Sequence, residues 1–517
     1  MNDKGSMPWQ VNARDLGTRN RPALREHLVV AVLAGDDAKP EGTALSGFLA
    51  AESNAEGLLQ WFGSTARDFD TMRQAMARDI ATIDALVSDL LDAILHHQDF
   101  KRLEASWRGV AYLVDQVESD EKIKVKLLNA TWAELVRDFD RATEFDQSML
   151  FAKVYSDEYD MPGGLPYGLL LCDYAVRHRF QGGTQKATDD VSALTGLAQV
   201  AAAAFAPCVI SAAPELFGVP TFADLSHTQM LDAGFQLAEY RRWQQLQEKD
   251  ESKFLGVLLP RILLRDMYRS SHSREDGFCY RERMNDINSW LWGNAVYGLG
   301  AVAMRAFHDR GWFADIRGTY PDREEGGLVA DLPAQVFSTR EAGAYRRALE
   351  VELTDKKQKK LEEMGFIALS PCSYTKSVVF LGMHSLHAPA ETRDPIARSN
   401  SHLSSMLQYV LCVSRFAHYI KIMARDRVGV HATAEELEKY LNDWLRGYMI
   451  GNAEASADLK ARYPLSAGSV EVSEMLGRPG FMSCIIHLQP HFQFDQVVTG
   501  FKLRTEFRVR NSSDRTL

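Results

Sequence analysis

The sequence lacks any run of apolar residues that approaches the roughly 20 needed to cross a membrane. The nearest candidate, residues 28–34, is short and follows a polar leader that contains Asp3 and Asp15. A secretory signal peptide has a charged start and a longer apolar centre, so this run predicts a short strand instead. We therefore expect the protein to be made and kept in the cytoplasm.

Cysteine pairs and an excess of positive charge are also missing. The six cysteines stand far apart, and no Cys-x-x-Cys pair that would indicate a zinc ribbon occurs. Apolar surroundings such as those of Cys412 predict buried free thiols in a reducing compartment. The formal net charge of -10 does not favour general binding to nucleic acid.

Catalytic signatures are equally scarce. The chain has no glycine loop ending in Gly-Lys-Ser/Thr, no His-Glu-x-x-His and no Gly-x-Ser-x-Gly. Gly298 and Gly300 fit a loose dinucleotide-binding pattern, but they lie inside an apolar helical run and do not open a helix after a strand. Small residues that permit close helix packing explain them better.

The histidines and acids considered one by one do not indicate a metal site or a catalytic group either. His96 and His97 are adjacent, so on a helix they point about 100° apart and would not chelate one metal together. We expect them at the surface or capping a helix, and His418 in a packed helix. Nothing in the sequence brings Asp146 and Asp173 together as a carboxylate pair. We predict no catalytic, metal-binding or cofactor-binding residue, and a protein that is not an enzyme.

The first 65 residues differ from the rest of the chain. A polar stretch, the run at 28–33 and a turn-rich stretch lead to a short helix expected over residues 44–62. Such a segment cannot bury its own apolar surface, so we interpret it as an arm that docks elsewhere. The apolar residues of the expected helix include Leu45, Phe48, Leu49, Leu58 and Leu59.

A long helix is predicted next, because apolar residues recur at steps of four and three from Met72 to Ile94. A single stripe on a long helix is typical of pairing with a helix of another chain. Packing within its own domain is the alternative interpretation. The central residues of the stripe are Met76, Ile80, Ile83, Val87 and Leu90.

The middle of the chain predicts an α/β core. Residues 123–128 alternate like a strand, and residues 169–174 read as a buried strand after a turn cluster. A helix over 187–206 and a strand from Cys208 complete a β-turn-α-β rhythm. Further helices are expected at 289–308, at 355–363 with Gly365 as its C-cap, at 402–425, and after Thr433, which forms a capping box with Glu436.

The C-terminus is predicted to be β, with strands over 481–488 and 497–509. In the last strand apolar and charged residues alternate with period two. This pattern fits a solvated edge strand protected by charge, an edge that pairs with another chain, or a basic face set against a partner. One face carries Phe501, Leu503 and Phe507, and the other carries Lys502, Arg504, Arg508 and Arg510.

Motifs spread over roughly residues 75–509 resemble the large sheath subunit of type VI secretion systems, the TssC/ImpC/EvpB/VipB family. The densest block begins at Ile94-Leu-His-His-Gln-Asp-Phe-Lys-Arg-Leu-Glu-Ala-Ser-Trp-Arg-Gly109 and ends at Asp173-Tyr174. Later matches include Trp292-Gly-Asn-Ala295, Arg415-Phe-Ala-His-Tyr419 with Lys421, Leu441-Asn-Asp-Trp444 and Leu488-Gln-Pro-His491.

The resemblance implies a structural role. A large subunit of this family joins a small subunit, TssB, and the heterodimers polymerise into a sheath around a tube of Hcp protein, which contraction propels. Neighbours exchange strands, and a ClpV-type AAA+ ATPase grips an N-terminal helix, with baseplate proteins as further partners. The resemblance points to Leu28, Val30 and Val32 and to the 501–509 strand for exchange, and to residues 44–62 for the ATPase.

The chain departs from the family at its first 65 residues and at Leu165, where an acid is expected. In these features the chain resembles the divergent, ImpD-like second copy of the large subunit that some bacteria carry beside the usual one. An accessory or baseplate-associated paralogue is therefore one alternative, and an unrecognised cytosolic enzyme is another. The enzyme would form a discrete oligomer with a deep polar pocket.

We predict an α+β fold, with a mixed α/β sheath-protein core, long amphipathic helices, an extended N-terminal arm and a C-terminal β-strand region. The expected divisions are the arm at 1–65, a long helical segment that pairs with the small subunit at 66–120, the α/β core at 121–400 and a helical and β part at 401–517.

Overall fold

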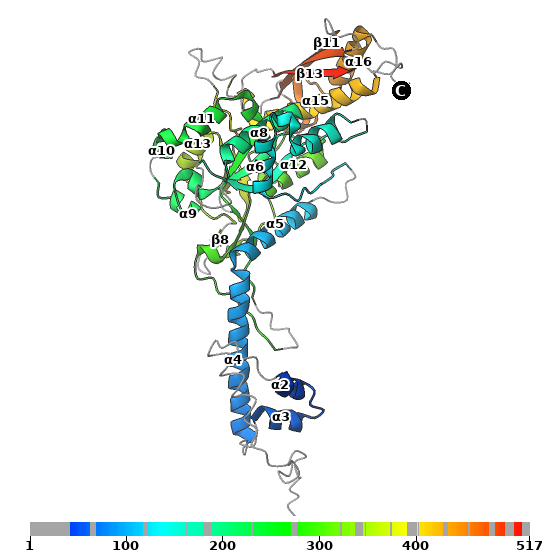
Figure 1. Cartoon of the computed structure of the whole chain (residues 1–517). Helices are drawn as coiled ribbons and strands as arrows, with labels where there is room; N and C mark the ends of the chain where they lie inside the picture. The colour runs from blue at the N-terminus through cyan, green and yellow to red at the C-terminus, as the bar shows by residue number, and fades with distance from the viewer. Residues whose placement is uncertain are drawn as a thin grey trace, which may run out of the picture. The chain divides into compact units, whose positions relative to one another are not determined.

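A computed structural model of the chain divides into two compact units, Met1–Phe100 with Met267–Met284, and Lys101–Asp266 with Asn285–Leu517. We call them unit 1 and unit 2. Figure 1 draws the elements of both, which combine helices and strands as predicted. The structure describes residues 42–62, 69–116, 122–161, 163–178, 188–228, 231–269, 277–320, 323–336, 345–346, 348–372, 375–389, 401, 403–427, 433–452, 455–474, 481–491 and 501–508.

Unit 1 is built on the long helix α4 (Phe69–Leu95), which confirms the helix predicted from the apolar stripe. The single helix predicted over 44–62 is wrong: the chain forms α2 (Gly42–Leu49) and α3 (Asn54–Phe62). The break falls at a short bend at residues 52–53, where Ser53 accepts a hydrogen bond from the Glu56 amide. A side-chain oxygen in this position favours a new helix start.

Unit 2 contains a six-stranded sheet in the order β1-β2-β3-β9-β10-β6. The first four strands are parallel, and β10 runs antiparallel to both neighbours. The predicted β-turn-α-β rhythm is confirmed, since α8 (Asp190–Ala203) connects β1 to its neighbour β2. The strands are β1 (Leu170–Val176), β2 (Cys208–Ala212), β3 (Leu255–Leu259), β9 (Phe366–Pro371), β10 (Val378–Phe380) and β6 (Leu328–Val329).

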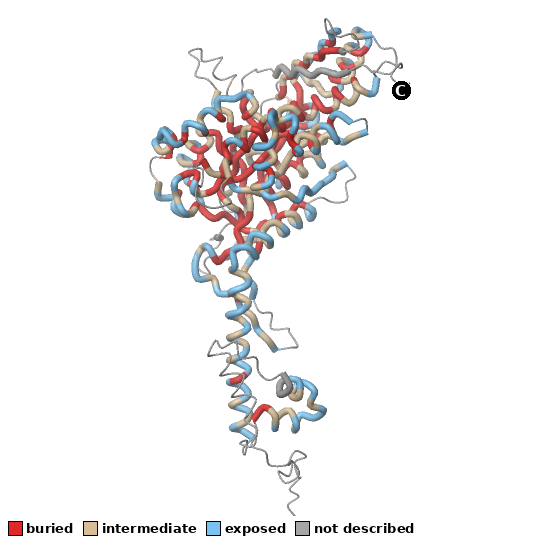
Figure 2. Tube along the Cα trace, in the orientation of Figure 1, coloured by how far each residue is buried: buried red, intermediate tan, exposed pale blue. Residues whose placement is uncertain are grey.

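The core of unit 2 lies between this sheet and its helices, where Figure 2 shows buried residues gathered. Alternate residues of β2, such as Cys208 and Ile210, pack in one cluster with α8. The opposite face meets α5 (Gln98–Asp115) and α12 (Val296–Arg310): a Cβ added to Gly300 would lie 2.6 Å from Leu171 Cδ1. This close approach confirms the packing explanation for that glycine.

The C-terminal part of unit 2 is a three-stranded antiparallel sheet in the order β11-β12-β13, packed on two helices. Its strands are β11 (Leu465–Glu474), β12 (Phe481–Pro490) and β13 (Phe501–Arg508), and the helices are α15 (Leu407–Arg427) and α16 (Ala434–Arg446). The capping box of Thr433 and Glu436 is confirmed. In the aromatic core here, Trp312 stacks on Phe416 with ring centroids 4.1 Å apart.

Two other predictions need correction, and one strand was missed. Residues 123–128 belong to no strand. The helix expected from residue 289 starts at Val296, because a 3-10 turn and β5 (Leu291–Gly293) precede it. β11 was not predicted, because its core-facing residues alternate with serines, a glycine and glutamates. Gly365, at φ +85°, ends α13 (Asp355–Glu363) as predicted.

The remaining elements are short segments that connect these layers. They are α6 (Trp132–Arg141), η2 (Phe145–Gln147), α7 (Met149–Phe151), η3 (Ala152–Tyr159), η4 (Pro214–Phe217), α9 (Phe222–Leu225), α10 (Leu231–Phe235), η5 (Ala238–Tyr240), α11 (Arg241–Gln247), η6 (Asp250–Phe254), β4 (Ile262–Arg265), η7 (Ile287–Ser289), β7 (Gln335–Val336), β8 (Tyr345–Arg346) and α17 (Ala457–Arg462).

Candidate assembly surfaces

The apolar stripe of α4 is exposed in unit 1. Its five central residues, Met76, Ile80, Ile83, Val87 and Leu90, are each between 38% and 61% exposed. Their spacing of four, three, four and three averages 3.5 residues, which is the repeat of a coiled-coil seam. Asp79 is the one buried residue of this helix among those described. Within the described part of unit 1, therefore, these five residues remain exposed.

The N-terminal end of α4, including Met72 at the start of the stripe, holds α2 and α3. Trp61 and Phe62 are buried, and Phe48, Leu58 and Met72 pack against them. The Trp61 indole N–H donates to Asp79 Oδ2 at 3.1 Å, which ties α3 to α4. The described part of the predicted arm, residues 42–62, thus docks on a helix of its own chain.

The ATPase-recognition candidates divide into two groups. Phe48 and Leu58 face the Trp61 cluster, whereas Leu49 and Leu59 are exposed. The side chain of Leu45 lies outside the described residues, as do Leu28, Val30 and Val32.

Another face of α4 binds the segment at 277–284 through polar contacts. The Tyr280 hydroxyl donates to Asp92 Oδ1 at 2.6 Å, and Arg283 pairs with Asp92 at 3.2 Å. His96 Nε2 lies 3.2 Å from Glu282 Oε1, and His97 Nδ1 accepts from the Asp99 amide in the first turn of α5. The capping role is therefore confirmed for His97.

The C-terminal sheet has one covered edge and one edge without a described neighbour. On the outer side of β11, the Asn442 amide group donates to Val470 O at 2.8 Å and accepts from Val470 N at 2.9 Å. Glu438 accepts from the Val472 amide at 2.9 Å. Side chains of α16 therefore form hydrogen bonds with backbone groups of β11 that could otherwise pair with a strand of another chain.

The other edge is β13, which carries the predicted exchange residues. Its backbone is paired with β12 so that Leu503 lies opposite Ile486 and Phe507 opposite Met482. Among the described strands, no strand pairs with the outer side of β13. The side chains of 501–508, including Lys502, Arg504 and Arg508, and the whole of Arg510 lie outside the described part.

The motif residues meet one another in the core of unit 2. Asp173 accepts hydrogen bonds from Ser106 of α5 and from the Tyr297 hydroxyl of α12, at 2.9 Å for the tyrosine. Gly109 lies so close to Tyr297 that an added Cβ would be 2.3 Å from its ring. Asp173 thus fastens two helices to β1, and Asp146 is not among its partners.

His418 and Lys421 of α15 are likewise structural. Burial lowers the pKa of His418 to about 3, and its Nε2 bonds to the Ala204 carbonyl at 2.9 Å. Lys421 donates to the Tyr155 hydroxyl at 3.1 Å and lies over the Tyr159 ring, and burial lowers its pKa. A neutral, fully enclosed imidazole has no route to a substrate, which agrees with the predicted packed helix.

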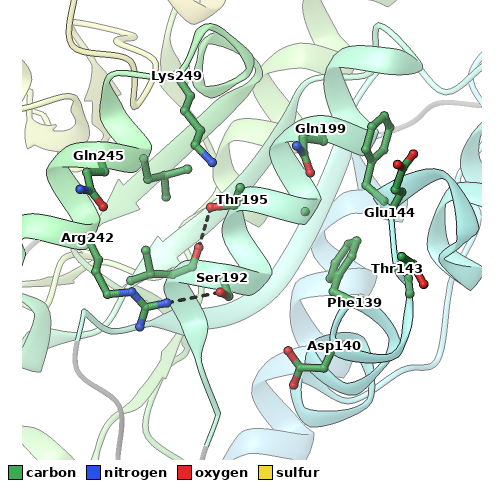
Figure 3. A pocket seen from close by; sticks show the side chains of 15 residues that line it. Phe139, Asp140, Thr143, Glu144, Ser192, Thr195, Gln199, Arg242, Gln245 and Lys249 are labelled. Carbon is green, nitrogen blue, oxygen red and sulfur yellow. Dashed lines mark hydrogen bonds between the residues drawn. The ribbon is translucent and has the colours of Figure 1, made fainter.

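One cavity of about 620 Å³ opens between α6, α8 and α11 (Figure 3). Arg242, Lys249, Glu144 and Thr195 are among its polar lining residues. The Arg242 guanidinium is held by Asp189 at 2.6 Å and by Ser192 at 3.3 Å. The lining brings together no nucleophile with a base, and within the described ranges no group of His, Cys, Asp and Glu is arranged to hold a metal.

All six cysteines are free, as expected, but their burial differs. Cys208, Cys412 and Cys484 are buried, whereas Cys279 is exposed. No helix in the described ranges is long and apolar enough to span a bilayer.

Comparison with known proteins decides whether the chain is a structural subunit or an enzyme. Residues 77–387 match the family described as EvpB/VC_A0108, tail sheath N-terminal domain, and residues 396–507 match its tail sheath gpW/gp25-like domain. The chain belongs to the EvpB/VC_A0108 tail sheath family. This sheath protein is 34% identical over 430 residues to the type VI secretion system sheath protein TssC1 of Pseudomonas aeruginosa, covering 82% of this chain and 84% of the relative.

Two solved structures are also similar to this sheath protein. The baseplate of the anti-feeding prophage matches at 9% identity and a TM-score of 0.32, covering 69% of this chain and 74% of that one. The contracted helical sheath of the same particle matches at 10% identity and a TM-score of 0.27, covering 67% and 73%.

Membership confirms the family resemblance and the prediction that the protein is not an enzyme, because the family consists of structural sheath proteins. Sequence reasoning missed two features of the assembly surfaces. Asn442 was noted as part of a motif, but its role required β11, which was not predicted. The exposed residues Leu103, Trp107 and Val114 of α5 recur at steps of four and seven, and that helical signal was present in the sequence.

Proposed function

We propose that the chain is the large subunit of a type VI secretion sheath and forms a heterodimer with a small, TssB-like subunit through the α4 stripe. The observation that carries this proposal is the row of exposed apolar residues from Met76 to Leu90 at a 3.5-residue repeat. An isolated exposed leucine needs no explanation, but a continuous stripe on one helix marks an interaction site. A helix with a matching seam is the partner that such a stripe fits.

The second part of the proposal concerns polymerisation. The outer edge of β13 receives a strand from a neighbouring protomer, and the run at 28–33 supplies one, so that main-chain hydrogen bonds join the lattice. The α16 side chains on β11 support this choice, because they leave β13 as the edge available for pairing. The cations Lys502, Arg504, Arg508 and Arg510 form the basic face set against the tube or a neighbour.

The sheath surrounds an Hcp tube in the cytoplasm, anchored at the inner membrane through a baseplate. Contraction is a rigid-body repacking of subunits between two discrete lattices and requires no chemistry in this chain. A ClpV-type ATPase recognises the region of α2 and α3 after contraction, and Leu49 and Leu59 are its candidate contacts because they are exposed.

Co-expression with the small subunit tests the proposal. We expect a stable complex that assembles into long hollow tubes visible by negative-stain microscopy. Deletion of residues 1–35 is expected to leave the heterodimer but prevent ordered tubes, and normal tubes from that truncation would refute the arm assignment. Short particles bound only to sheath ends would instead identify an accessory paralogue. Absence of any complex would contradict the proposed function.

A further inference from the structure

The first three turns of α4 carry the contact with α3. Met72 and Ala75 pack against the buried side chains of Trp61 and Phe62. Asp79 accepts a hydrogen bond from the Trp61 indole N–H at 3.1 Å. Because the three α4 residues stand three and four positions apart, they share one face of the helix. The last two residues of α3 are therefore seated on this face.

This contact coincides with the start of the apolar stripe. Where two helices pair, a side chain of one enters a hole bounded by four residues of the other. The four stand at positions i, i+3, i+4 and i+7, because residues three and four apart are neighbours on a helix surface. The residues with this spacing at the start of the stripe are Met72, Ala75, Met76 and Asp79. Three of these four contact α3, so α3 occupies the hole that a partner's side chain would fill.

The stripe continues beyond this hole with its side chains exposed. Ile80 is 53% exposed and Leu90 is 61% exposed, and both belong to the same row. A helix of another chain that follows the row buries apolar surface at each turn. At the first hole it meets α3, and one hole accepts one side chain. The arm and such a helix therefore compete for the start of the stripe.

Few contacts hold the arm on α4. Of the described side chains of residues 46–62, only Trp61 and Phe62 are buried. Phe48, whose ring centre lies 5.2 Å from that of Trp61, and Leu58 are partly buried against them. An element with few buried apolar contacts opens at a lower free energy than the whole fold. α2 and α3 therefore leave α4 more easily than the chain unfolds.

We infer that α2 and α3 form a displaceable cover of the stripe, which a helix of the small subunit replaces when it pairs along α4 from Met72 onwards. This inference rests on the proposed function for the identity of the partner. The docked arm weakens the apparent affinity for the small subunit, because only chains with an open first hole pair along the whole stripe. Pairing in turn releases the arm, since coupling between two binding events is reciprocal.

Variants that loosen the arm should bind the small subunit more tightly than the parent chain does. Trp61→Phe removes the indole donor to Asp79 and should lower the Kd about fivefold or more in titration calorimetry. Trp61→Ala also empties the first hole and should lower the Kd further, about tenfold or more. Glu56→Gln is the matched control on α3, because Glu56 is exposed and outside the cluster. It should leave the Kd within about twofold.

Hydrogen exchange on the unaltered chain gives a second measurement. Amides of α3 should exchange about tenfold or more faster in the complex with purified small subunit than in the free chain. The reason is that a helix of nine residues is marginal in water once its packing is lost. Exchange in unit 2 should be the same in the parent chain and in the Trp61 variants, which shows that the substitutions act on the arm and leave the fold intact.

The outcomes separate this inference from the proposed function. Weaker binding by both Trp61 variants, or slower exchange of α3 in the complex, would show that α3 is part of the partner's binding surface and overturn the cover. A complex that forms with unchanged affinity and unchanged exchange would show that the partner does not use the first hole, and would also overturn it. Both results leave the heterodimer intact. Failure to form any complex contradicts the proposed function and the inference with it.

Discussion

Truncation of the α4 stripe should weaken assembly without weakening the fold. Leu90 is 61% exposed and Ile80 is 53% exposed in the free chain. Complete burial of such a side chain stabilises by about 1.5–3 kcal/mol, so covering the exposed part of each gains about 1–2 kcal/mol. Truncation to alanine removes much of this, and we expect a loss of about 1 kcal/mol for each residue.

The two losses should add. Ten residues of helix separate Ile80 from Leu90 by roughly 15 Å, which is far enough for independent effects. The double variant Ile80→Ala with Leu90→Ala should therefore lose about 2 kcal/mol, an increase of roughly 30-fold in the Kd for the small subunit. Titration calorimetry with the purified small subunit measures this, with Leu237→Ala as a control of similar exposure, 55%, in unit 2.

The folding stability of the free chain distinguishes the two interpretations of the stripe, namely pairing with a helix of another chain and packing within its own unit. Surface truncations away from a packed core change the free energy of unfolding by less than about 0.5 kcal/mol. An unchanged Kd in the double variant would refute helix pairing. A loss of folding stability as large as the loss of affinity would mean that the stripe packs within its own unit.

Three further predictions concern single contacts. Trp61→Phe removes the hydrogen bond to Asp79 and should destabilise the docking of α3 by about 1–3 kcal/mol, seen as faster hydrogen exchange in α3. Because burial lowers the pKa of His418 to about 3, the unfolded chain takes up this proton first, so stability falls as pH drops from about 6.5 towards 3. In His418→Gln, the free energy of unfolding measured by urea titration should depend less on pH, by up to about 1.4 kcal/mol per pH unit. An unchanged dependence of this free energy on pH would contradict the prediction. Asn442→Leu removes both bonds to Val470 and should cost about 2 kcal/mol in thermal unfolding, while Asn442→Asp keeps one acceptor and should cost less.

Periodic patterns predicted the long elements of this chain well. The stripe from Met72 to Ile94 located α4, and the capping box at Thr433 located the start of α16. Both depend on local physics, namely side chains that share a helix face and a hydroxyl that satisfies free amides. The β-turn-α-β order of β1, α8 and β2 was also predicted, because a helical pattern lies between two apolar runs.

Other features depended on contacts that local patterns do not encode. Residues 123–128 have the alternation of a strand but no partner strand within the described chain, so alternation alone gave the wrong element. β11 has weak alternation and is stabilised by β12 and by Asn442. The sequence also could not predict that Trp61 would bond to Asp79, because docking of α3 on α4 is a tertiary event.

Helical reconstruction of the co-expressed complex by electron cryomicroscopy tests the central claim most directly. The account predicts a hollow tube in which a small-subunit helix covers Met76, Ile83 and Leu90, and in which a neighbour's strand pairs with the outer edge of β13. A tube in which the α4 stripe faces solvent, or a discrete particle that does not extend, would contradict it.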